Sequence, residues 1–586
     1  MQKITLLVSL KARDSALSVL RKMGVVHIEH MRTPQAEHIT SLEQKLMLLD
    51  KALTIVAEEK TQKDDLNENE IASYVKEIID FDKQKQKLDL RIEEFEKERV
   101  WFDQWGNVSQ STLSDLEESG VFIKLYTTDK KSLKSIPQDK LVQILREDGN
   151  KVYLAFIGSS SKDSLDFVEV LPPSENLHSL ERKLETTKDN LNSINDKLQK
   201  ASSYTNIFSD YKADLLKKLE FCNVRFGMKE DEGISCLEGF CPKDTVVLIR
   251  KTADKEGWAV FARDPDVPQE APTLIKNPKW VEIIKPVFKF MGTLPGYEEY
   301  DISFWFLIFF SLFFAMLIGD AGYGLFFLIT TFFLQRKFKN IIKGPFLLMY
   351  LLSGATIIWG AITGTWFGFE QIAQLPVLNF LVVDRINSFV GSNQIFMIYL
   401  CFLIGAIHLS IAHGIIAFRF INSVVALGQL GWICIVWAAF FVAGELVLSR
   451  PMPDFTAILG IIGFVLVILF GNPQKNILKG MALSLADLPL KVIGSFSDIV
   501  SYLRLFIVGY ATVAVAGAFN NMAVGEGINS IFAGLLAAVI LFLGHSLNIL
   551  LGLMSVIVHG IRLNMLEFSG HLNMEWSGKE YRPFKE

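Results

Sequence analysis

One arginine in the middle of a long apolar stretch is the residue of this sequence with the clearest chemical consequence. Arg504 lies in SFSDIVSYLRLFIVGYATVAVAGAF, 15 residues after Pro489 and 16 before Asn520. A guanidinium at the centre of a membrane span costs about 2.5–3.5 kcal/mol on insertion scales and keeps its proton at physiological pH. Asp498 lies on another helix face, and Glu567 lies near the predicted end of the last span. We therefore expect a carboxylate of another subunit to compensate Arg504, rather than snorkelling or solvation by water.

Six polar or small residues of the last apolar segment share one helix face, because successive members lie three or four residues apart. They are His545, Asn548, Gly552, Ser555, His559 and Arg562. Their stripe covers roughly 25 Å of helix at ~1.5 Å per residue, which is most of a bilayer core. Such a stripe either holds helices together or lines a hydrated path. We prefer the path, because packing alone requires neither the two histidines nor the arginine.

Other ionisable residues of the apolar half give weaker signals. Asp320, in the GDAGYG sequence of residues 319–324, falls at a predicted turn between two spans, where a structural role is open. Glu445 is a candidate for the lining of an outer vestibule. Arg450 and Asp454, just beyond it, are candidates for the same vestibule, and Glu370 and Asp384 are either lining or loop residues. For His408 and His413, packing and proton transfer stay equally open.

The distribution of charge divides this 586-residue chain, which is too long for one compact domain. Residues 1–300 hold 44 Lys+Arg and 51 Asp+Glu, whereas residues 301–586 hold 15 and 13. The second half is therefore typical of a membrane-embedded domain. The net charge of −5 gives no sign of a nucleic-acid partner.

Three sequence patterns that are missing narrow the function. Without a signal peptide at its start, the charged half is expected to stay in the cytoplasm. The five cysteines form no CxxC pair, so we expect reduced thiols and neither a metal nor another cofactor. The sequence has no phosphate-binding GxxxxGKS/T loop, so the chain is not expected to hydrolyse ATP by itself.

The charged half, residues 1–295, is predicted to be an N-terminal cytoplasmic arm. It opens with a strand, a helix and a strand, at 4–10, 15–23 and 25–29. A heptad rhythm of Leu177, Leu180, Leu184, Leu191, Ile194 and Leu198 predicts one coiled-coil helix over about 174–225. A second, over about 36–105 with a possible break near Asn67, would run antiparallel to it. Short apolar runs in 115–170 and 233–265 predict a small α/β domain at each end of the arm.

Residues 296–586 are predicted to form a polytopic α-helical membrane domain with eight transmembrane helices. The predicted spans are 302–319, 321–336, 345–363, 395–418, 427–449, 455–471, 490–520 and 527–567. With both termini inside, the inner loops hold Arg336, Lys337, Lys339, Lys343, Arg419, Lys475, Lys479 and Lys491, and the outer loops hold Arg385 and Arg450. This asymmetry favours cytoplasmic termini. The last two helices exceed a ~30 Å core and are expected to be long and tilted.

Taken together, these features resemble the a subunit, also called subunit I, of the V/A-type rotary ATPases. The resemblance covers essentially the whole chain. Its most specific motifs are SDIVSYLRLF around Arg504 and VHGIRLNMLEF around Arg562, followed by a short tail containing YRPF. Two positions depart from the eukaryotic pattern: Thr512 stands in place of a histidine and Gly552 in place of an acid.

The resemblance implies a stator subunit that forms two offset ion half-channels against a rotating ring of small membrane subunits, each with a buried carboxylate. Arg504 and Arg562 would face the ring. The candidate lining residues are Asp498, Ser501, His545, Asn548, Ser555, His559, Glu567 and Glu445. Implied partners are peripheral-stalk subunits, the central-stalk cap subunit and the lipid bilayer, in a bacterial plasma membrane. The coupling ion, H+ or Na+, and the direction of the machine stay open.

Two other classes of protein were weighed against this one. A secondary ion transporter with a cytoplasmic coiled-coil domain usually shows an internal repeat with paired broken spans, and this sequence shows none. A pure membrane scaffold would leave Arg504 and the polar stripe without a purpose. Co-isolation with a ring of very small hydrophobic subunits would distinguish the rotary assignment from both.

Overall fold

The computed structural model describes residues 1–56, 66–137, 140–160, 163–338, 343–474, 476–525, 527 and 530–586. Lys339, Lys475 and the part of the predicted first arm helix at 57–65 lie outside these ranges. The chain divides into two compact units, which are described separately. One comprises mainly Ile4–Gly239 with Asp244–Ala262 and Pro583–Glu586, and the other mainly Arg263–Arg582.

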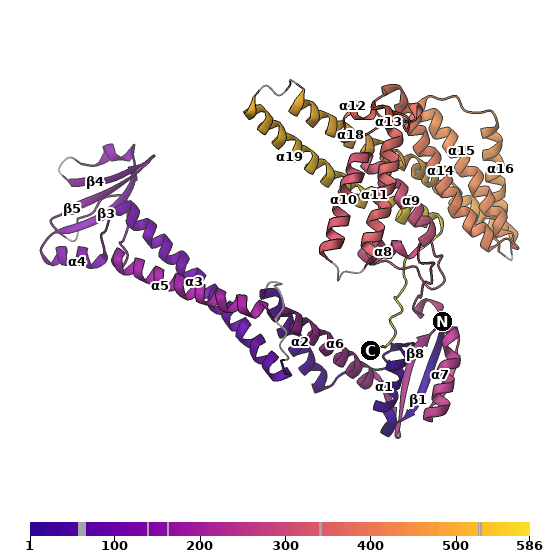
Figure 1. Ribbon diagram of the computed structural model, residues 1–586, viewed down its shortest axis with the longest axis horizontal. Helices are drawn as coiled ribbons and strands as arrows, with labels where there is room; N and C mark the ends of the chain where they lie inside the picture. The colour runs from indigo at the N-terminus through magenta and orange to yellow at the C-terminus, as the bar shows by residue number, and fades with distance from the viewer. Residues whose placement is uncertain are drawn as a thin grey trace. The chain divides into compact units, whose positions relative to one another are not determined.

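A small sheet with two helices begins the first unit (Figure 1). Its strand order is β2-β8-β1-β9, from β1 (Gln2–Ser9), β2 (His27–Glu29), β8 (Ile234–Cys241) and β9 (Ala259–Arg263), and β7 (Lys229–Asp231) pairs with β8. The helices are α1 (Arg13–Met23) and α7 (Lys243–Glu256). Alternate residues of β1 are buried, as expected for a strand with one face on a core. The predicted strand, helix and strand at the start of the chain are confirmed.

Four helices continue this unit as paired arms. α2 (Glu37–Ile55) packs on α6 (Thr205–Gly227), and α3 (Glu68–Trp105) packs on α5 (Leu177–Ser202). The ion pair between Lys188 and Glu96 shows that α3 and α5 are neighbours (Figure 1). Every position of the predicted heptad seam on α5 is buried or partly buried. A supercoil of the two helices stays a prediction.

Local chemistry explains where the arm helices begin. Asn67 caps α3, since its side chain accepts from the backbone N–H of Glu70 while the Glu70 carboxylate accepts from the N–H of Asn67. The predicted break near Asn67 is therefore confirmed. The second arm helix is also interrupted, between Ser202 and Thr205, which the sequence interpretation did not anticipate. Between α3 and α6, the hydrogen bond and charge of Lys218 lower the pKa of the Glu68 carboxyl.

An antiparallel sheet follows α3 and α4 (Gln110–Glu118). Its order is β4-β5-β3-β6, from β3 (Phe122–Asp129), β4 (Leu141–Asp148), β5 (Lys151–Gly158) and β6 (Val168–Glu169). In the register of the central pair, Phe122 lies opposite Gly158. The Trp105 ring at the end of α3 packs edge-on against the Tyr153 ring of β5, with 5.1 Å between centroids. This contact holds the sheet against the end of the arm helix.

The second unit is a bundle of apolar helices (Figure 1). They are α9 (Ser303–Ile318), α10 (Ala321–Lys337), α11 (Lys343–Thr363), α14 (Gln394–Arg419), α15 (Val425–Leu448), α16 (Phe455–Phe470), α17 (Ile477–Ser501), α18 (Leu503–Val524) and α19 (Ile531–Ser555). Short helices between Glu370 and Asn393 join α11 to α14. Each of the eight predicted spans is thus helical, but their number as spans is not confirmed.

Length separates the helices that could cross a bilayer from those that are short. Five helices of the described chain are long and apolar enough, or six if the pair α9 and α10, bent by 117°, counts as one broken span. α16 has 16 residues, fewer than the ~20 that a hydrocarbon core requires. The coarser description that holds is a membrane domain with five to six candidate spans.

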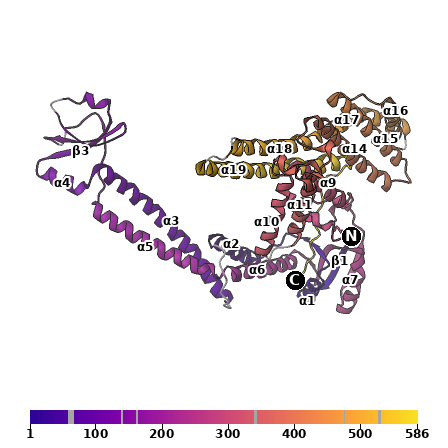
Figure 2. The same cartoon turned by 45° about the horizontal axis from the view of Figure 1, so that its top comes forward.

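The last two long helices lie side by side (Figure 2). α17 and α18 form one apolar segment of 47 residues, and α19 continues to His571 for 41 residues. Two stretches of this last segment, Val556–Gly560 and Leu563–Phe568, are π-helical, and α20 (Ser569–His571) ends it. The predicted great length of both segments is confirmed, although α17 begins before Pro489 rather than after it. Their tilt stays a prediction.

The turn between α9 and α10 is organised by Asp320. Its fully buried carboxylate accepts hydrogen bonds from the backbone N–H groups of Gly322, Tyr323, Phe367 and Gly368, at 2.7–3.3 Å. It therefore caps α10 and fixes the loop after α11 in the same contact. The structural role considered for this residue is confirmed.

Candidate functional site: two arginines on one buried glutamate

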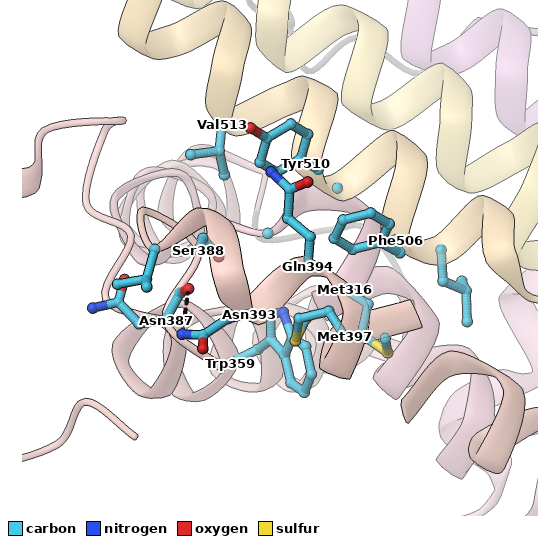
Figure 3. A pocket seen from close by; sticks show the side chains of 14 residues that line it. Met316, Trp359, Asn387, Ser388, Asn393, Gln394, Met397, Phe506, Tyr510 and Val513 are labelled. Carbon is cyan, nitrogen blue, oxygen red and sulfur yellow. Dashed lines mark hydrogen bonds between the residues drawn. The ribbon is translucent and has the colours of Figure 1, made fainter. Parts of the chain in front are cut away.

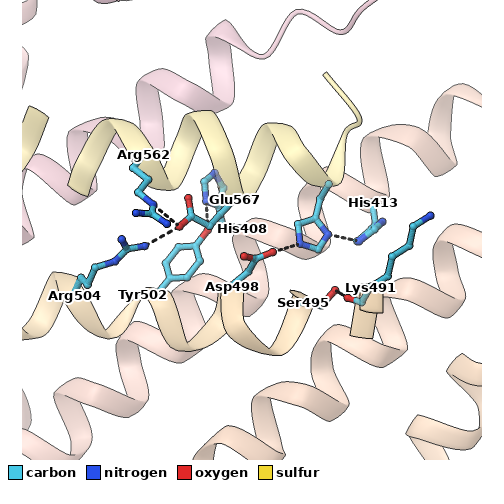
Figure 4. Close-up of polar contacts among 10 residues, drawn as sticks. His408, His413, Lys491, Ser495, Asp498, Tyr502, Arg504, Arg562 and Glu567 are labelled. Atoms are coloured by element: carbon cyan, nitrogen blue, oxygen red, sulfur yellow. Dashed lines mark hydrogen bonds and ion pairs between the residues drawn. The ribbon is translucent and has the colours of Figure 1, made fainter. Parts of the chain in front are cut away.

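The counter-charge of Arg504 lies in its own chain, which corrects the expectation of a partner on another subunit only. Nη2 of Arg504 donates to Oε1 of Glu567 at 2.7 Å, and Nε of Arg562 lies 3.5 Å from the same oxygen (Figure 4). The Glu567 side chain is 4% exposed, whereas those of Arg504 and Arg562 are 24% and 52% exposed. The carboxylate is thus inside the bundle, and both guanidiniums reach it from the outside.

Helix geometry explains why the sequence did not reveal this pairing. Arg562 and Glu567 are five residues apart, which in an α-helix places them on different faces. The chain is π-helical from Leu563 to Phe568, and the i to i+5 spacing of a π-helix brings them to one side. The Arg504 side chain also leans back along its helix, since its Nε donates to the carbonyl of Ser501 at 3.0 Å. Both effects move the guanidinium towards Glu567.

The charges of this cluster do not balance. Two guanidiniums share one carboxylate, so the three side chains carry a net charge of one positive unit when all are ionised. Oε2 of Glu567 is buried and has no hydrogen-bond partner among the described residues. The expected need for a counter-charge from outside the chain therefore remains, reduced in strength by Glu567. After the internal pair forms, one positive charge still faces outwards from an apolar bundle.

His545 and Asn548, both candidate lining residues, belong to a hydrogen-bond chain inside the bundle. Nε2 of His545 bonds Oδ1 of Asn520 at 3.1 Å, and its Nδ1 bonds the Tyr323 hydroxyl at 2.8 Å. Nδ2 of Asn548 donates to the same hydroxyl, at 2.9 Å, and to a carbonyl of α18. Since Nδ2 of Asn520 already donates to a backbone carbonyl, the chain is satisfied with a neutral His545 protonated on Nε2. These contacts match the alternative of the stripe, which is to hold helices together.

The other predicted lining residues are distributed unevenly around the arginine pair. Ser555 is partly exposed and its hydroxyl donates to its own helix. His559, with its Nδ1 unpartnered within the described chain, is partly exposed. Ser501 contributes the carbonyl noted above, and Glu445 is exposed near the end of α15. The structure therefore places Glu567 and Ser501 beside the arginines. The lining roles of the other residues stay predictions.

Asp498 lies in a second polar group, which includes a residue that sequence reasoning missed. Its Oδ2 is 3.1 Å from Nε2 of His571, and Nδ1 of His571 is 2.9 Å from Nε2 of His413 (Figure 4). A signal for His571 was present, since it follows Glu567 by four residues and so belongs to the same helical face. His408 instead lies stacked between the rings of Phe309 and Phe568, with centroids 3.9 and 4.2 Å away. Packing is thus the role that its contacts support.

A small pocket borders the arginine helix on another side (Figure 3). Its wall includes Leu505 and Phe506, which directly follow Arg504 in α18. Its lining also includes Asn387 from the segment before α14, Gln394 from the first position of α14 and Tyr510 from α18. Neutral polar side chains and apolar rings therefore share this wall.

A bundle of apolar helices that holds two arginines against one buried carboxylate, joined to a charged helical arm, defines a polytopic membrane protein built to manage charge within the bilayer. The chain is 32% identical to V-type ATP synthase subunit I of Borreliella burgdorferi, over all of this chain and 99% of that one. It is 27% identical to V-type ATP synthase subunit I 1 of Treponema pallidum, again over all of this chain and 99% of that one. The chain therefore belongs to the family of subunit I of the V-type and A-type ATP synthases, the membrane stator subunit of these rotary complexes.

The other comparisons give weaker matches or none. A-type ATP synthase subunit I of Methanocaldococcus jannaschii is 27% identical over 70% of this chain and 64% of its own length. A solved structure of the cytoplasmic N-terminal domain of subunit I, homolog of subunit a, of V-ATPase matches 45% of this chain and all of that one, at 14% identity and a TM-score of 0.23, too low to establish a shared fold. No family model matches the chain.

Proposed function

We propose that this subunit forms two offset ion half-channels against a rotating ring of small membrane subunits and so couples ion movement to rotation. The observation that carries the proposal is the unbalanced cluster of Arg504, Arg562 and Glu567. A net positive charge that faces the apolar surroundings of the bundle requires a carboxylate from outside the chain. A buried carboxylate on each ring subunit would supply it in turn.

The chemistry follows from the permanence of the guanidinium charge. A ring carboxylate that reaches Arg504 is held ionised by it, so its ion must leave before it arrives. Past the arginine, a new ion neutralises the carboxylate and lets it enter lipid. Arg504 therefore also separates the two half-channels, because a cation that crosses directly would have to pass a fixed positive charge.

The surface around the arginines is apolar, which supports contact with an apolar ring of subunits. Along the last helical segment, large apolar side chains are exposed on both sides of Ser555: Leu547, Leu550, Leu551 and Met554 on α19 and Val558 in the π-helical stretch after it. Exposed apolar surface of this kind suits either lipid or an apolar protein surface. Two routes approach Arg504 from different sides. The pocket beside Leu505 is a candidate for one half-channel, and the polar group around Asp498 is a candidate for the other.

The remaining parts of the proposal concern the arm and the membrane. The paired arm helices would act as the stator and hold against torque through peripheral-stalk subunits, with the central-stalk cap subunit as a further neighbour. We propose eight membrane-crossing or membrane-inserted helices in a bacterial plasma membrane, with both termini in the cytoplasm. The chain itself would bind no nucleotide, and ATP would be hydrolysed or made by other subunits.

The first prediction tests Arg504 in the whole complex. Arg504→Ala removes the charge that clears each passing carboxylate, so ATP-driven ion uptake by reconstituted vesicles is expected to fall to background while the subunit still co-purifies with the ring. Arg336→Ala is the matched control, because Arg336 is exposed at the end of α10 and lies over the Phe332 ring, away from the cluster. Normal uptake by Arg504→Ala would remove the residue from the mechanism.

The alternative of a secondary ion transporter makes a different prediction. It requires substrate-dependent uptake by the isolated chain, without a ring and without ATP. Membership of the subunit I family counts against it, and vesicles that contain the chain alone decide the matter directly. Uptake there, with no ring co-isolated, would favour the transporter.

A further inference from the structure

Four side chains from four helices form a continuous hydrogen-bonded series beside the arginine site, and Figure 4 draws the part of it from Asp498 to His413. Oδ2 of Asp498 on α17 lies 3.1 Å from Nε2 of His571 on α20, whose Nδ1 lies 2.9 Å from Nε2 of His413 on α14. Nδ1 of His413 lies 2.7 Å from Oε1 of Gln429 on α15. All three contacts are within normal hydrogen-bond distance.

In one arrangement, the directions of the hydrogen bonds along this series require one additional proton. Gln429 Oε1 can only accept, so Nδ1 of His413 must donate, and a neutral His413 then accepts on Nε2 from Nδ1–H of His571. A neutral His571 therefore has only an acceptor left on Nε2, and it faces the oxygen of Asp498. The third hydrogen bond forms only if Asp498 or His571 holds one additional proton. In this arrangement the series as a unit binds one proton.

A second, equally satisfied arrangement exists with one proton fewer. A half-turn of the Gln429 amide presents Nε2 as a donor to Nδ1 of His413. Nε2–H of His413 then donates to Nδ1 of His571, and Nε2–H of His571 donates to an ionised Asp498. Every contact is kept in both arrangements, and only the direction of the hydrogen bonds changes. Such a series can take up and release a proton without losing a contact.

We propose that Asp498, His571 and His413 form a proton relay that serves the ion path on the Asp498 side of Arg504. The inference rests on the proposed function and assigns protons as the coupling ion. In one step an N–H bond forms at Nδ1 of His413, the Nε2–H of His413 moves to Nδ1 of His571, and the Nε2–H of His571 moves to Oδ2 of Asp498. One proton has then entered at His413 and is held on Asp498; the reverse sequence releases it.

The surroundings of the relay suit this task. Asp498 is 32% exposed and precedes Arg504 by six residues on the same long helical segment, while His571 is 11% exposed and follows Glu567 by four. At the other end the Trp432 ring lies parallel to His413 and also lines a small pocket with Asp487 and Lys491. Trp432 therefore links His413 to a pocket with charged side chains in its wall.

The ionisable groups on the helices that pack here are few. α17 contributes Asp487, Lys491 and Asp498, and α14 contributes His408, which is stacked between two rings. Glu567 precedes the relay on the last helical segment and is held by two arginines. Among the described residues, Asp498 pairs with His571 alone. The relay therefore reaches from His413, beside Trp432, to the neighbourhood of the arginine site without drawing on Glu567.

The test uses the reconstituted whole complex and compares ATP-driven uptake of protons and of sodium. His571→Gln keeps hydrogen bonding but cannot exchange one proton for another, so proton uptake is expected to fall by about a hundredfold, as for loss of a positioned proton carrier. Asp498→Asn should have the same effect. Ser495→Ala is the matched control, because its hydroxyl donates only to its own helix at 2.9 Å, one turn before Asp498.

A second experiment adds imidazole to vesicles that contain the His571→Ala complex. Imidazole can replace a lost proton carrier, but it would not restore a lost structural contact. Recovery of proton uptake there supports a relay, and it applies even if the variant assembles poorly, because uptake is compared with and without imidazole on one sample. Unchanged proton uptake by both His571→Gln and Asp498→Asn overturns the relay. Sodium uptake with no proton uptake by the unaltered complex overturns it too, while the proposed rotary function stands. No uptake of either ion by the unaltered complex would defeat the proposed function and the relay together.

Discussion

Glu567 is the residue on which both arginines of the site depend. Its buried carboxylate accepts from Arg504 and lies 3.5 Å from Arg562. Glu567→Gln keeps the shape but raises the net charge of the cluster by one unit. Breaking a buried pair by removing one partner typically costs about 3–5 kcal/mol. We therefore expect a lower melting temperature of the purified complex, measured by tryptophan fluorescence, and reduced ion uptake.

A second substitution separates charge from shape in this test. Arg562→Gln combined with Glu567→Gln returns the net charge of the cluster to one positive unit. If charge imbalance is the cause, the double variant should melt above the single Glu567→Gln variant, and the coupling energy follows from the cycle of four proteins. A double variant that melts no higher would show that Glu567 stabilises the bundle for another reason.

At the residue scale, the sequence predicts a feature of the site only where the feature does not depend on which side of a helix each residue faces. The charge problem of Arg504 required only its position in an apolar segment, and the expected surplus charge is present in a reduced form. The identity of the internal partner required the phase of the last helix after Ser555. Two π-helical stretches change that phase, and nothing in the pattern of Leu, Val and Ile predicts where they fall. His571 was missed for a different reason, since its spacing of four from Glu567 is visible in the sequence but its partners on α14 and α17 are not.

At the scale of helices, close backbone contact positions the arginine helix. α18 crosses α9 at Gly509, where an added Cβ would meet the carbonyl oxygen of Met316 at 2.2 Å. Gly509→Ala must therefore separate the two helices, which for an overpacked site costs about 1–3 kcal/mol. Since Arg504 is only five residues away, we expect both the melting temperature and coupled uptake to fall.

The same helix offers a matched control. At Gly517 an added Cβ would be 3.8 Å from the nearest atom, the carbonyl oxygen of Gly368, which is an ordinary contact. Gly517→Ala is therefore expected to leave melting temperature and uptake close to those of the unaltered complex. Equal melting temperatures for the two variants would refute the idea that the crossing at Gly509 positions Arg504.

Elements with strong period or composition were predictable, and elements set by packing were not. The start of the arm and the break at Asn67 follow from local signals, the second a capping contact. The number of spans does not, because α9, α10 and α16 are apolar throughout yet have 16 or 17 residues. Composition says that such helices are buried in protein or lipid. Taken together α9 and α10 are long enough for one span, but the bend of 117° between them, which the sequence does not reveal, makes that span a broken one.

At the scale of the whole molecule, the charge asymmetry of the sequence predicted one arm followed by one apolar bundle. The chain instead passes between its two compact units several times, since each unit contains segments from both ends of the sequence. Its last four residues, Pro583–Glu586, belong to the same unit as β1 and α1. The second half of the YRPF motif, Pro583 and Phe584, therefore has a structural explanation in that unit. The covalent path from His571 to Phe584 is 13 residues long.

Phe584 is the anchor of this tail, and its contacts give the last prediction. Its ring is 2% exposed, lies 6.3 Å from the Phe221 ring and faces the Arg21 guanidinium, while its N–H donates to the carbonyl of Val26 at 2.8 Å. Phe584→Ala should cost about 3–5 kcal/mol as a buried aromatic truncation. We expect faster amide hydrogen exchange in α1 of the full-length subunit, whereas Glu586→Gln, at an exposed position, should leave exchange unchanged. If the Phe584 ring fills the core, its removal must leave a cavity and lower the protection of α1. Equal protection of α1 in the two variants would therefore mean that the tail contacts this unit without stabilising it.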